Sequence, residues 1–160
     1  MKDKRRVILP GSYDPVTVGH LDMIKRAAES FSEVYAVCFI NPDKEYTFSI
    51  DDRVRMLILA TEGLDNVIVS YSLGRVVDYM REHEIDLIVK GYRNGTDLEY
   101  ERRQAEYNKL HGGYETLLWE ASRDNVAVSS SLARDMLIRG EDPSSILPSG
   151  VIEYVKSIKK

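Results

Sequence analysis

The segment Gly11-Ser12-Tyr13-Asp14-Pro15-Val16-Thr17-Val18-Gly19-His20 decides the fold of this chain. It follows the apolar run 7–9, which ends at Pro10, and leads into residues 21–31, where apolar side chains recur at helical spacing. A strand, a glycine-containing turn and a helix in this order favour anion binding, because backbone N–H groups and the positive end of the helix dipole face the ligand. His20 adds a donor that can become cationic near neutral pH. The segment therefore predicts a phosphate site.

Strand-length apolar runs alternate with segments of helical period along the rest of the chain. We expect strands at 7–9, 34–40, 66–71, 85–89 and 114–119, and helices at 21–31, 49–61, 75–82, 97–110, 129–139 and 149–158. This alternation implies parallel strand pairing with right-handed crossovers. The predicted fold is α/β: a Rossmann-like, doubly wound, five-stranded parallel sheet with helices on both faces, built by a single domain over residues 1–160.

Composition narrows the class of protein. The chain has 160 residues, a formal net charge of −4 and 43% hydrophobic residues, which suits one soluble globular domain. Its single cysteine, Cys38, excludes an intrachain disulfide and a cysteine zinc cluster. The net charge and the lack of a basic stripe disfavour nucleic-acid binding. No apolar run approaches the ~18 residues of a membrane span, so we expect no membrane partner and a cytoplasmic location.

Residues suited to phosphate binding follow three of the predicted strands. In a doubly wound sheet the ligand lies at the carboxyl ends of the strands, where strand order reverses. We therefore expect the loops after the first, second and fourth strands to converge, bringing together Ser12 and His20, Lys44, and the run Lys90-Gly91-Tyr92-Arg93. Gly91 would let backbone N–H groups approach a phosphate closely.

Other polar segments are less specific. The run Ser129-Ser130-Ser131, with Arg134 one turn later, is either a simple helix cap or a second phosphate-binding helix start. Glu101 suits a solvated helix face as well as it suits a site. His83 and His111 lack the context of His20 and are expected on the surface near helix ends.

Two of these motifs resemble the signatures of the nucleotidyltransferase superfamily of adenylyl- and cytidylyltransferases. Thr17-Val18-Gly19-His20 is similar to its T/H-x-G-H element, and Val128-Ser129-Ser130-Ser131-Leu132-Ala133-Arg134 to its I-S-S-S/T-x-x-R/K element. Within the superfamily the chain resembles the bacterial phosphopantetheine adenylyltransferases over essentially its whole length. That resemblance rests further on Asn41-Pro42-Asp43-Lys44, on the run from Lys90 to Glu101, and on Asn108.

The resemblance implies a reaction in which ATP and 4′-phosphopantetheine give dephospho-CoA and pyrophosphate. It also implies Mg²⁺, held mainly by the ATP phosphates and not by metal ligands of the protein, a homohexamer built as a dimer of trimers, and CoA as a feedback ligand. The catalytic residues would be His20, Lys44 and Arg93. The phosphopantetheine positions would be Ser12, Lys44, Val76, Lys90 and Asn108. The ATP positions would be Ser12, Tyr13, His20, Gly91, Tyr92, Arg93, Glu101, Asn125, Val126, Ala127, Val128, Ser129, Ser130 and Ser131.

The chain also departs from the family pattern. Lys90 stands where arginine is frequent, Arg75 where leucine is usual, and Asn125-Val126-Ala127 replaces an aromatic-Ser-aromatic run. Two alternatives therefore stay open. One is another small-molecule nucleotidyltransferase, with nicotinamide mononucleotide or a sugar or polyol phosphate as acceptor, although such relatives usually carry H-x-G-H where this chain has Thr17. The other is a non-catalytic relative that binds a nucleotide or CoA.

Overall fold

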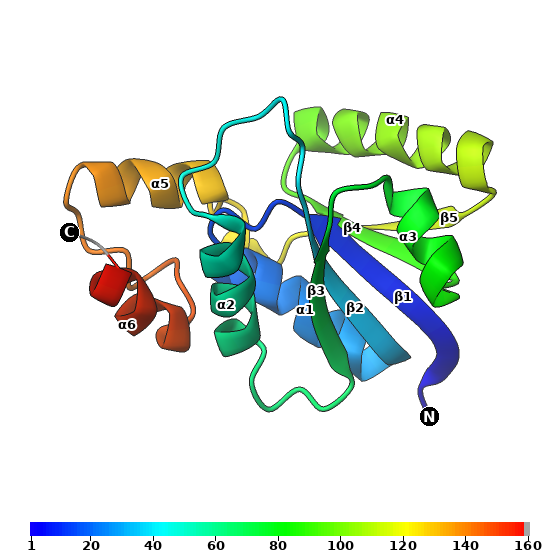
Figure 1. Cartoon of the computed structure of the whole chain (residues 1–160), viewed down its shortest axis with the longest axis horizontal. Helices are drawn as coiled ribbons and strands as arrows, with labels where there is room; N and C mark the ends of the chain where they lie inside the picture. Colours follow the sequence, from blue (N-terminus) through cyan, green and yellow to red (C-terminus); the bar gives the residue numbers. More distant parts are fainter. Residues whose placement is uncertain (159–160) are drawn as a thin grey trace.

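The computed structural model describes residues 1–158 and centres on a five-stranded parallel sheet of order β3-β2-β1-β4-β5 (Figure 1). The strands are β1 (Asp3–Gly11), β2 (Phe31–Phe39), β3 (Val67–Ser72), β4 (Leu87–Tyr92) and β5 (Glu115–Glu120). The helices are α1 (Val18–Ser30), α2 (Ile50–Ala60), α3 (Val76–His83), α4 (Gly95–Gly112), α5 (Ser130–Ile138) and α6 (Ser149–Ile158), with a short 3-10 turn at Arg123–Asn125. The predicted fold class is confirmed, and strand order reverses at β1, between β2 and β4.

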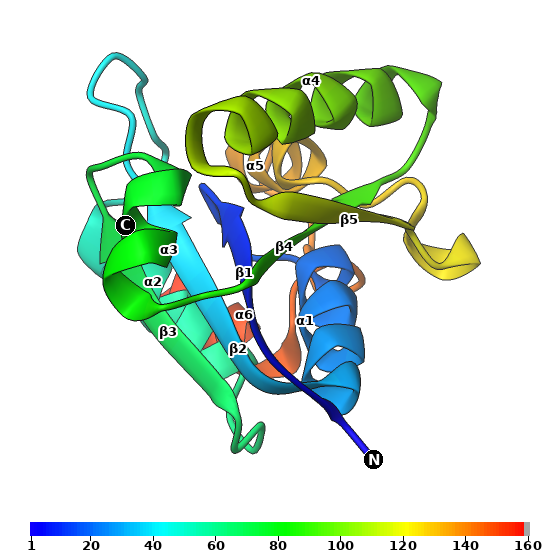
Figure 2. The ribbon, with the colours of Figure 1, turned by 90° about the vertical axis from the view of Figure 1, so that its right-hand side faces the viewer.

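Alternate residues of the central strands pack on opposite layers of helices. In β1, Val7 and Leu9 join the larger core with Ile24 of α1, whereas Ile8 joins a second core with Met80 of α3. This follows from the two-residue period of a strand. Figure 2 shows the result: α4 lies across β4 and β5, and α1 lies on the other side of the sheet.

Side-chain caps start three helices at the sequence positions that favour them. Thr17, Ser49 and Ser129 are the N-cap residues of α1, α2 and α5, and each hydroxyl accepts a hydrogen bond from the backbone N–H three residues later. These bonds satisfy amides that have no partner inside the helix. The caps at Thr17 and Ser129 place two helix N-termini at the same end of the sheet.

Strands β1 and β4 end two and three residues later than the sequence predicts. Strand β1 extends to Gly11, because Pro10 and Gly11 still align with Val37 and Cys38 of β2. Strand β4 was expected to end at residue 89, but it continues to Tyr92, because residues 90–92 align with residues 118–120 of β5. Lys90, Gly91 and Tyr92 therefore lie in the strand, and only Arg93 follows it.

Helix α4 differs from the other long helices because none of its residues is buried. It contacts α3, β4 and β5, yet no apolar stripe seats it on the sheet. Although α4 spans 18 residues, no helix in the described part of the chain combines the length and the apolar character needed to cross a membrane.

The end of α4 packs closely on α3 because Gly112 has no side chain. A Cβ atom there would lie 2.8 Å from Val77 Cγ1 and 2.9 Å from Val77 Cβ. We expect Gly112→Ala to lower the free energy of unfolding by about 1–3 kcal/mol, as over-packing usually does, measured by urea denaturation. Gly95→Ala at the other end of the same helix is the matched control, because a Cβ there meets nothing within 4 Å. Equal stability of the two variants would contradict this packing role.

Candidate functional site

The carboxyl ends of β1, β2 and β4 open into a cavity of about 810 Å³. Its walls come from the β1–α1 turn, the loop after β2, the end of β4 with the start of α4, and the start of α5. The predicted residues that line it are Ser12, Tyr13, His20, Lys44, Lys90, Gly91, Tyr92, Arg93, Glu101, Asn125, Val128, Ser129, Ser130 and Ser131. The prediction that the three loops converge is confirmed.

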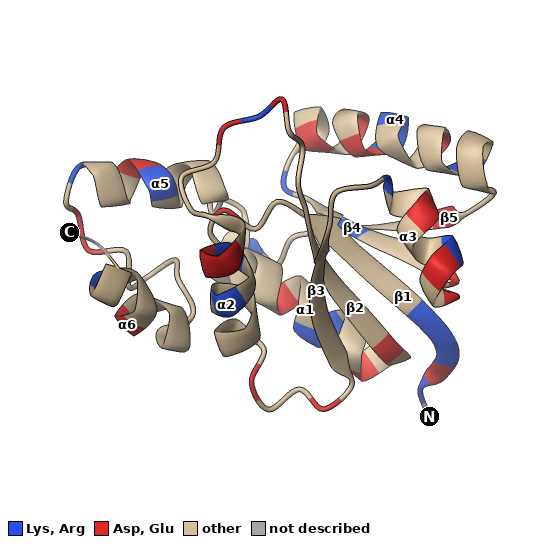
Figure 3. Cartoon of the chain, viewed as in Figure 1, with Lys and Arg blue, Asp and Glu red and all other residues tan. Residues whose placement is uncertain are grey.

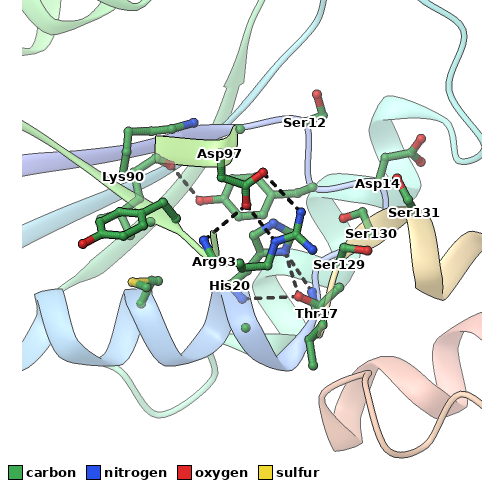
Figure 4. A pocket seen from close by; sticks show the side chains of 18 of the residues that line it. Ser12, Asp14, Thr17, His20, Lys90, Arg93, Asp97, Ser129, Ser130 and Ser131 are labelled. Carbon is green, nitrogen blue, oxygen red and sulfur yellow. Dashed lines mark hydrogen bonds and ion pairs between the residues drawn. The ribbon is translucent and has the colours of Figure 1, made fainter. Parts of the chain in front are cut away.

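His20 is held by a reciprocal pair of hydrogen bonds with Thr17 (Figure 4). The His20 amide donates to Thr17 Oγ1 at 3.3 Å, and the Thr17 amide donates to His20 Nδ1 at 3.0 Å. Because a backbone N–H can only donate, Nδ1 must carry no proton, and the ring proton of neutral His20 resides on Nε2. The cap therefore fixes both the tautomer and the orientation of the ring. The His20 and Tyr13 rings also form a T-shaped contact, with 4.9 Å between the ring centres.

The charge state of His20 differs from the expectation. Burial, followed by the positive charges of Lys90 and Arg93, lowers the pKa of His20 to about 4. The expectation of a cationic donor near neutral pH is therefore wrong. The surroundings of the ring, including two nearby cations, favour the uncharged form, which offers a neutral N–H donor.

Each basic residue at the end of β4 already has a carboxylate partner. Lys90 Nζ lies 3.3 Å from Glu101 Oε2, and Arg93 Nε lies 3.0 Å from Asp97 Oδ2. Burial raises the pKa of Glu101, and the charge of Lys90 acts in the opposite direction. These pairs hold the cations in place without ligand, and an incoming phosphate would compete for the same donors.

Lys44 is the exposed cation of the site. It lies in the loop after β2 between Asp43 and Glu45, where Figure 3 shows blue between two red segments. Its ammonium group lies 5.6 Å from the centre of the Tyr46 ring. A flexible lysine on such a loop can follow a bound anion.

The start of α5 is tied to the β1–α1 turn. Arg134 donates to the backbone oxygen of Asp14 at 2.9 Å and to Ser131 Oγ at 3.1 Å, and Ser130 Oγ donates to Pro15 O at 2.8 Å. Figure 4 shows the three labelled serines beside the Asp14 segment. Arg134 thus acts as a tether between the start of α5 and the β1–α1 turn, which lie far apart in sequence.

Sequence reasoning missed two residues that hold the walls together. Both carboxylate oxygens of Asp14 accept backbone N–H groups, from Thr47 and Phe48, each at 2.9 Å. Arg53 is only 2% exposed and donates to Ser12 O at 3.0 Å and to Phe48 O at 3.2 Å. Arg53 could have been found from its place in the apolar stripe of α2; Asp14 had no such signal.

A second cavity, of about 590 Å³, continues from the first between the sheet and α4. Val76 and Asn108 line it, and so does Arg75, whose guanidinium is held by Asp78 at 3.0 Å and by the Tyr107 hydroxyl at 3.4 Å. The residues that line both cavities are Pro10, Gly11, Ser12, Lys44, Tyr46, Lys90, Tyr100 and Glu101. The shared wall therefore carries two lysines.

Four of the predicted ATP residues either lie outside the cavities or make contacts within the protein that the sequence did not indicate. Val126 and Ala127 line neither cavity. The Tyr13 ring is buried, and its hydroxyl donates to Leu9 O at 2.7 Å. At Gly91 a Cβ would lie 2.8 Å from the terminal methyl group of Met23 of α1, so a larger residue there would displace the end of that flexible side chain.

The described residues contain no group of three or more histidine, cysteine or acidic side chains placed to hold a metal ion. Three carboxylates of the first cavity contact protein groups: Asp14 accepts two backbone amides, Asp97 pairs with Arg93, and one oxygen of Glu101 pairs with Lys90.

Two helix N-termini, a neutral histidine donor and several cations line one cavity of this α/β domain at a strand-order reversal, an arrangement suited to phosphate groups. The family of the chain is more specific than this structural class. The chain belongs to the cytidylyltransferase-like family, whose model matches residues 8–136. That span runs from β1 into α5 and includes every lining residue discussed above, so the protein is a nucleotidyltransferase.

The charge of His20 can be measured directly. The folded-state pKa of about 4 lies below the ordinary value of 6.5. We therefore expect the ring to stay neutral, with its proton on Nε2, from pH 8 down to about pH 5 in an NMR titration of the histidine ring signals. As the pH falls below 6.5 the unfolded chain takes up the proton first, so the contribution of His20 to stability decreases between about pH 6.5 and 4. The NMR signal of His20 is identified by its loss in His20→Gln. A titration midpoint near 6.5 would show that His20 is not held neutral.

The Asp14 contacts predict a stability effect. Asp14→Ala leaves the Thr47 and Phe48 amides without their acceptor, and hydrogen bonds to a charged group typically contribute about 1.5–3 kcal/mol. We expect a loss of about that size in the free energy of unfolding, measured by urea denaturation. Asp14→Asn keeps one acceptor oxygen and should lose less. If the two variants are equally stable, the carboxylate does not hold this loop.

Proposed function

We propose that this nucleotidyltransferase transfers the adenylyl group of ATP to 4′-phosphopantetheine, giving dephospho-CoA and pyrophosphate, a step of coenzyme A synthesis. One observation carries the proposal: two cavities share a wall that holds Ser12, Lys44 and Lys90. Such a wall suits two phosphate-bearing ligands whose reacting groups meet there. The resemblance of Thr17–His20 and Ser129–Arg134 to the family signatures supports the same reaction.

ATP fits the first cavity. The N-termini of α1 and α5, together with Arg93, offer donors and positive charge to a triphosphate. Mg²⁺ bound to the triphosphate would neutralise part of its charge. The nucleoside would lie toward Asn125 and Val128, which line the first cavity and not the second.

The proposed reaction is an in-line displacement without a covalent enzyme intermediate. A phosphate oxygen of the acceptor forms a bond to the α-phosphorus of ATP, and the bond from that phosphorus to the bridging oxygen of pyrophosphate breaks. The nucleophile is already an anion at neutral pH, so no general base is needed. The Nε2–H of His20 donates to a non-bridging α-phosphate oxygen, where charge increases in the transition state.

Lys44 and Lys90 act on the acceptor. Both line the shared wall, where their charge offsets the repulsion between two anions that must approach to bonding distance. Lys90 would exchange Glu101 for the acceptor phosphate as it binds. Val76 and Asn108 would face the pantetheine arm in the second cavity.

The second cavity favours phosphopantetheine over a short acceptor such as a polyol phosphate. Its length runs from Lys90 on β4 to Asn108, near the end of α4, and gives a long arm more contacts than a compact one. A non-catalytic relative would not need a half-buried histidine whose tautomer is fixed by the Thr17 amide. We also propose a homohexamer, a cytoplasmic location and feedback by CoA, on the resemblance alone.

Product analysis tests the reaction. We expect mass spectrometry to detect dephospho-CoA and pyrophosphate after the protein is mixed with Mg-ATP and 4′-phosphopantetheine. His20→Ala should lower kcat by about 10² or more, because a donor to developing charge is typically worth about 3–4 kcal/mol. Formation of product only from nicotinamide mononucleotide or a polyol phosphate would reassign the acceptor.

Stability controls separate catalysis from folding. His20→Ala also removes the acceptor for the Thr17 amide and should cost about 1 kcal/mol of stability. His20→Gln keeps a capping acceptor and should retain that stability. His111→Ala, at an exposed histidine that lines neither cavity, should keep the normal rate. Near-normal turnover in His20→Ala would refute the role of His20.

A further inference from the structure

Two buried side-chain oxygens in the described residues have no hydrogen-bond partner, and both line the second cavity. They are Oε1 of Glu101, on α4, and Oγ1 of Thr116, on β5. A buried polar atom without a partner destabilises a fold, so such atoms are few and call for an explanation. Their occurrence together, on opposite walls of one cavity, indicates a ligand that supplies the missing partners.

The face of α4 toward the cavity is polar where a helix on a sheet is normally apolar. Its lining residues are Tyr100, Glu101, Gln104, Ala105 and Asn108, and the last four have the spacing i, i+3, i+4, i+7. That spacing ordinarily carries the apolar stripe that packs on a core. Here it presents a carboxylate and two carboxamides across an open space, and α4 has no buried residue.

Like Lys90, Thr116 is a polar residue on the opposite, sheet side of this space. It aligns with Ile88 in the β4–β5 pairing, and the Ile88 side chain belongs to the core on that face of the sheet. Ile88, Phe39 and Val76 give the cavity an otherwise apolar lining near this point. A single hydroxyl on an apolar floor can select a ligand group by hydrogen bonding, because a ligand without that group leaves the hydroxyl unpaired.

We propose that Thr116 recognises an amide of the acceptor arm and is a specificity-determining residue of this enzyme. This inference rests on the proposed function, in which the arm of 4′-phosphopantetheine occupies the second cavity. Thr116 Oγ1 forms its hydrogen bond only when the arm is bound. Thr116 lies away from the shared wall and contributes to acceptor binding, not to the chemical step.

The test is Thr116→Val, which keeps the shape of the side chain and removes the hydroxyl. We expect KM for 4′-phosphopantetheine to rise about three- to tenfold, as loss of one neutral hydrogen bond predicts, with kcat and KM for ATP unchanged. The melting temperature should stay the same or rise, because the ligand-free protein loses only an unpaired hydroxyl. Thr116→Ser should restore most of the affinity.

Thr61→Val is the matched control for removing a buried threonine hydroxyl. Thr61 Oγ1 donates to Leu57 O at 2.8 Å, and Thr61 lines neither cavity. This variant should lower the melting temperature and leave KM for the acceptor unchanged. The opposite responses of the two variants would separate recognition from folding.

The outcomes distinguish the two proposals. If the unmodified protein does not adenylylate 4′-phosphopantetheine, the proposed function fails and the inference about Thr116 fails with it. If the unmodified protein is active but Thr116→Val keeps its acceptor KM, only the inference is overturned. It is also overturned if Thr116→Val lowers the melting temperature and raises KM for both substrates alike, since that result identifies a structural role.

Discussion

The hydrogen bond from the Thr17 amide to His20 Nδ1 sets the geometry of the site. It caps α1, and it leaves Nε2 as the only place for the proton of a neutral ring. The three-residue spacing between Thr17 and His20 therefore allows one cap to start α1 at the cavity and to leave the Nε2–H of His20 as a donor. Because the cap is built from the backbone of the β1–α1 turn, the histidine is positioned before any ligand arrives.

Electrostatic balance is the second constraint. In the proposed reaction the site must attract two anions, yet without ligand its cations must not destabilise the fold. Lys90 and Arg93 meet this requirement with Glu101 and Asp97, while the guanidinium of Arg53 is satisfied by backbone oxygens of Ser12 and Phe48. Phosphates can then exchange for carboxylates at little net change in charge pairing. The neutral state of His20 fits the same logic, because a third cation beside Lys90 and Arg93 would be unfavourable.

The sequence was sufficient for the fold class and for most of the first cavity. Alternating apolar runs predict a doubly wound sheet, and in such a sheet the residues after the strands must meet. The end of β4 was misplaced because Lys90 and Gly91 are typical of a loop in the sequence. In the structure their pairing with β5 keeps them in the strand. The neutral His20 could not be predicted, because its pKa depends on burial and on cations contributed by another strand. Arg134 lines the first cavity, and its hydrogen bonds to Asp14 O and Ser131, which tie α5 to the β1–α1 turn, had no signal in the sequence.

The position of β1 has a consequence for how the protein is made. This strand comes first in the sequence but lies in the middle of the sheet, and Ile8 aligns with Ile88, which the ribosome adds 80 residues later. The hydrogen bond between Arg134 and Asp14 joins residues that lie even farther apart in the sequence than Ile8 and Ile88. A nascent chain can therefore pair β1 with β2 early, but the first cavity is complete only after α5 has emerged, near the end of synthesis.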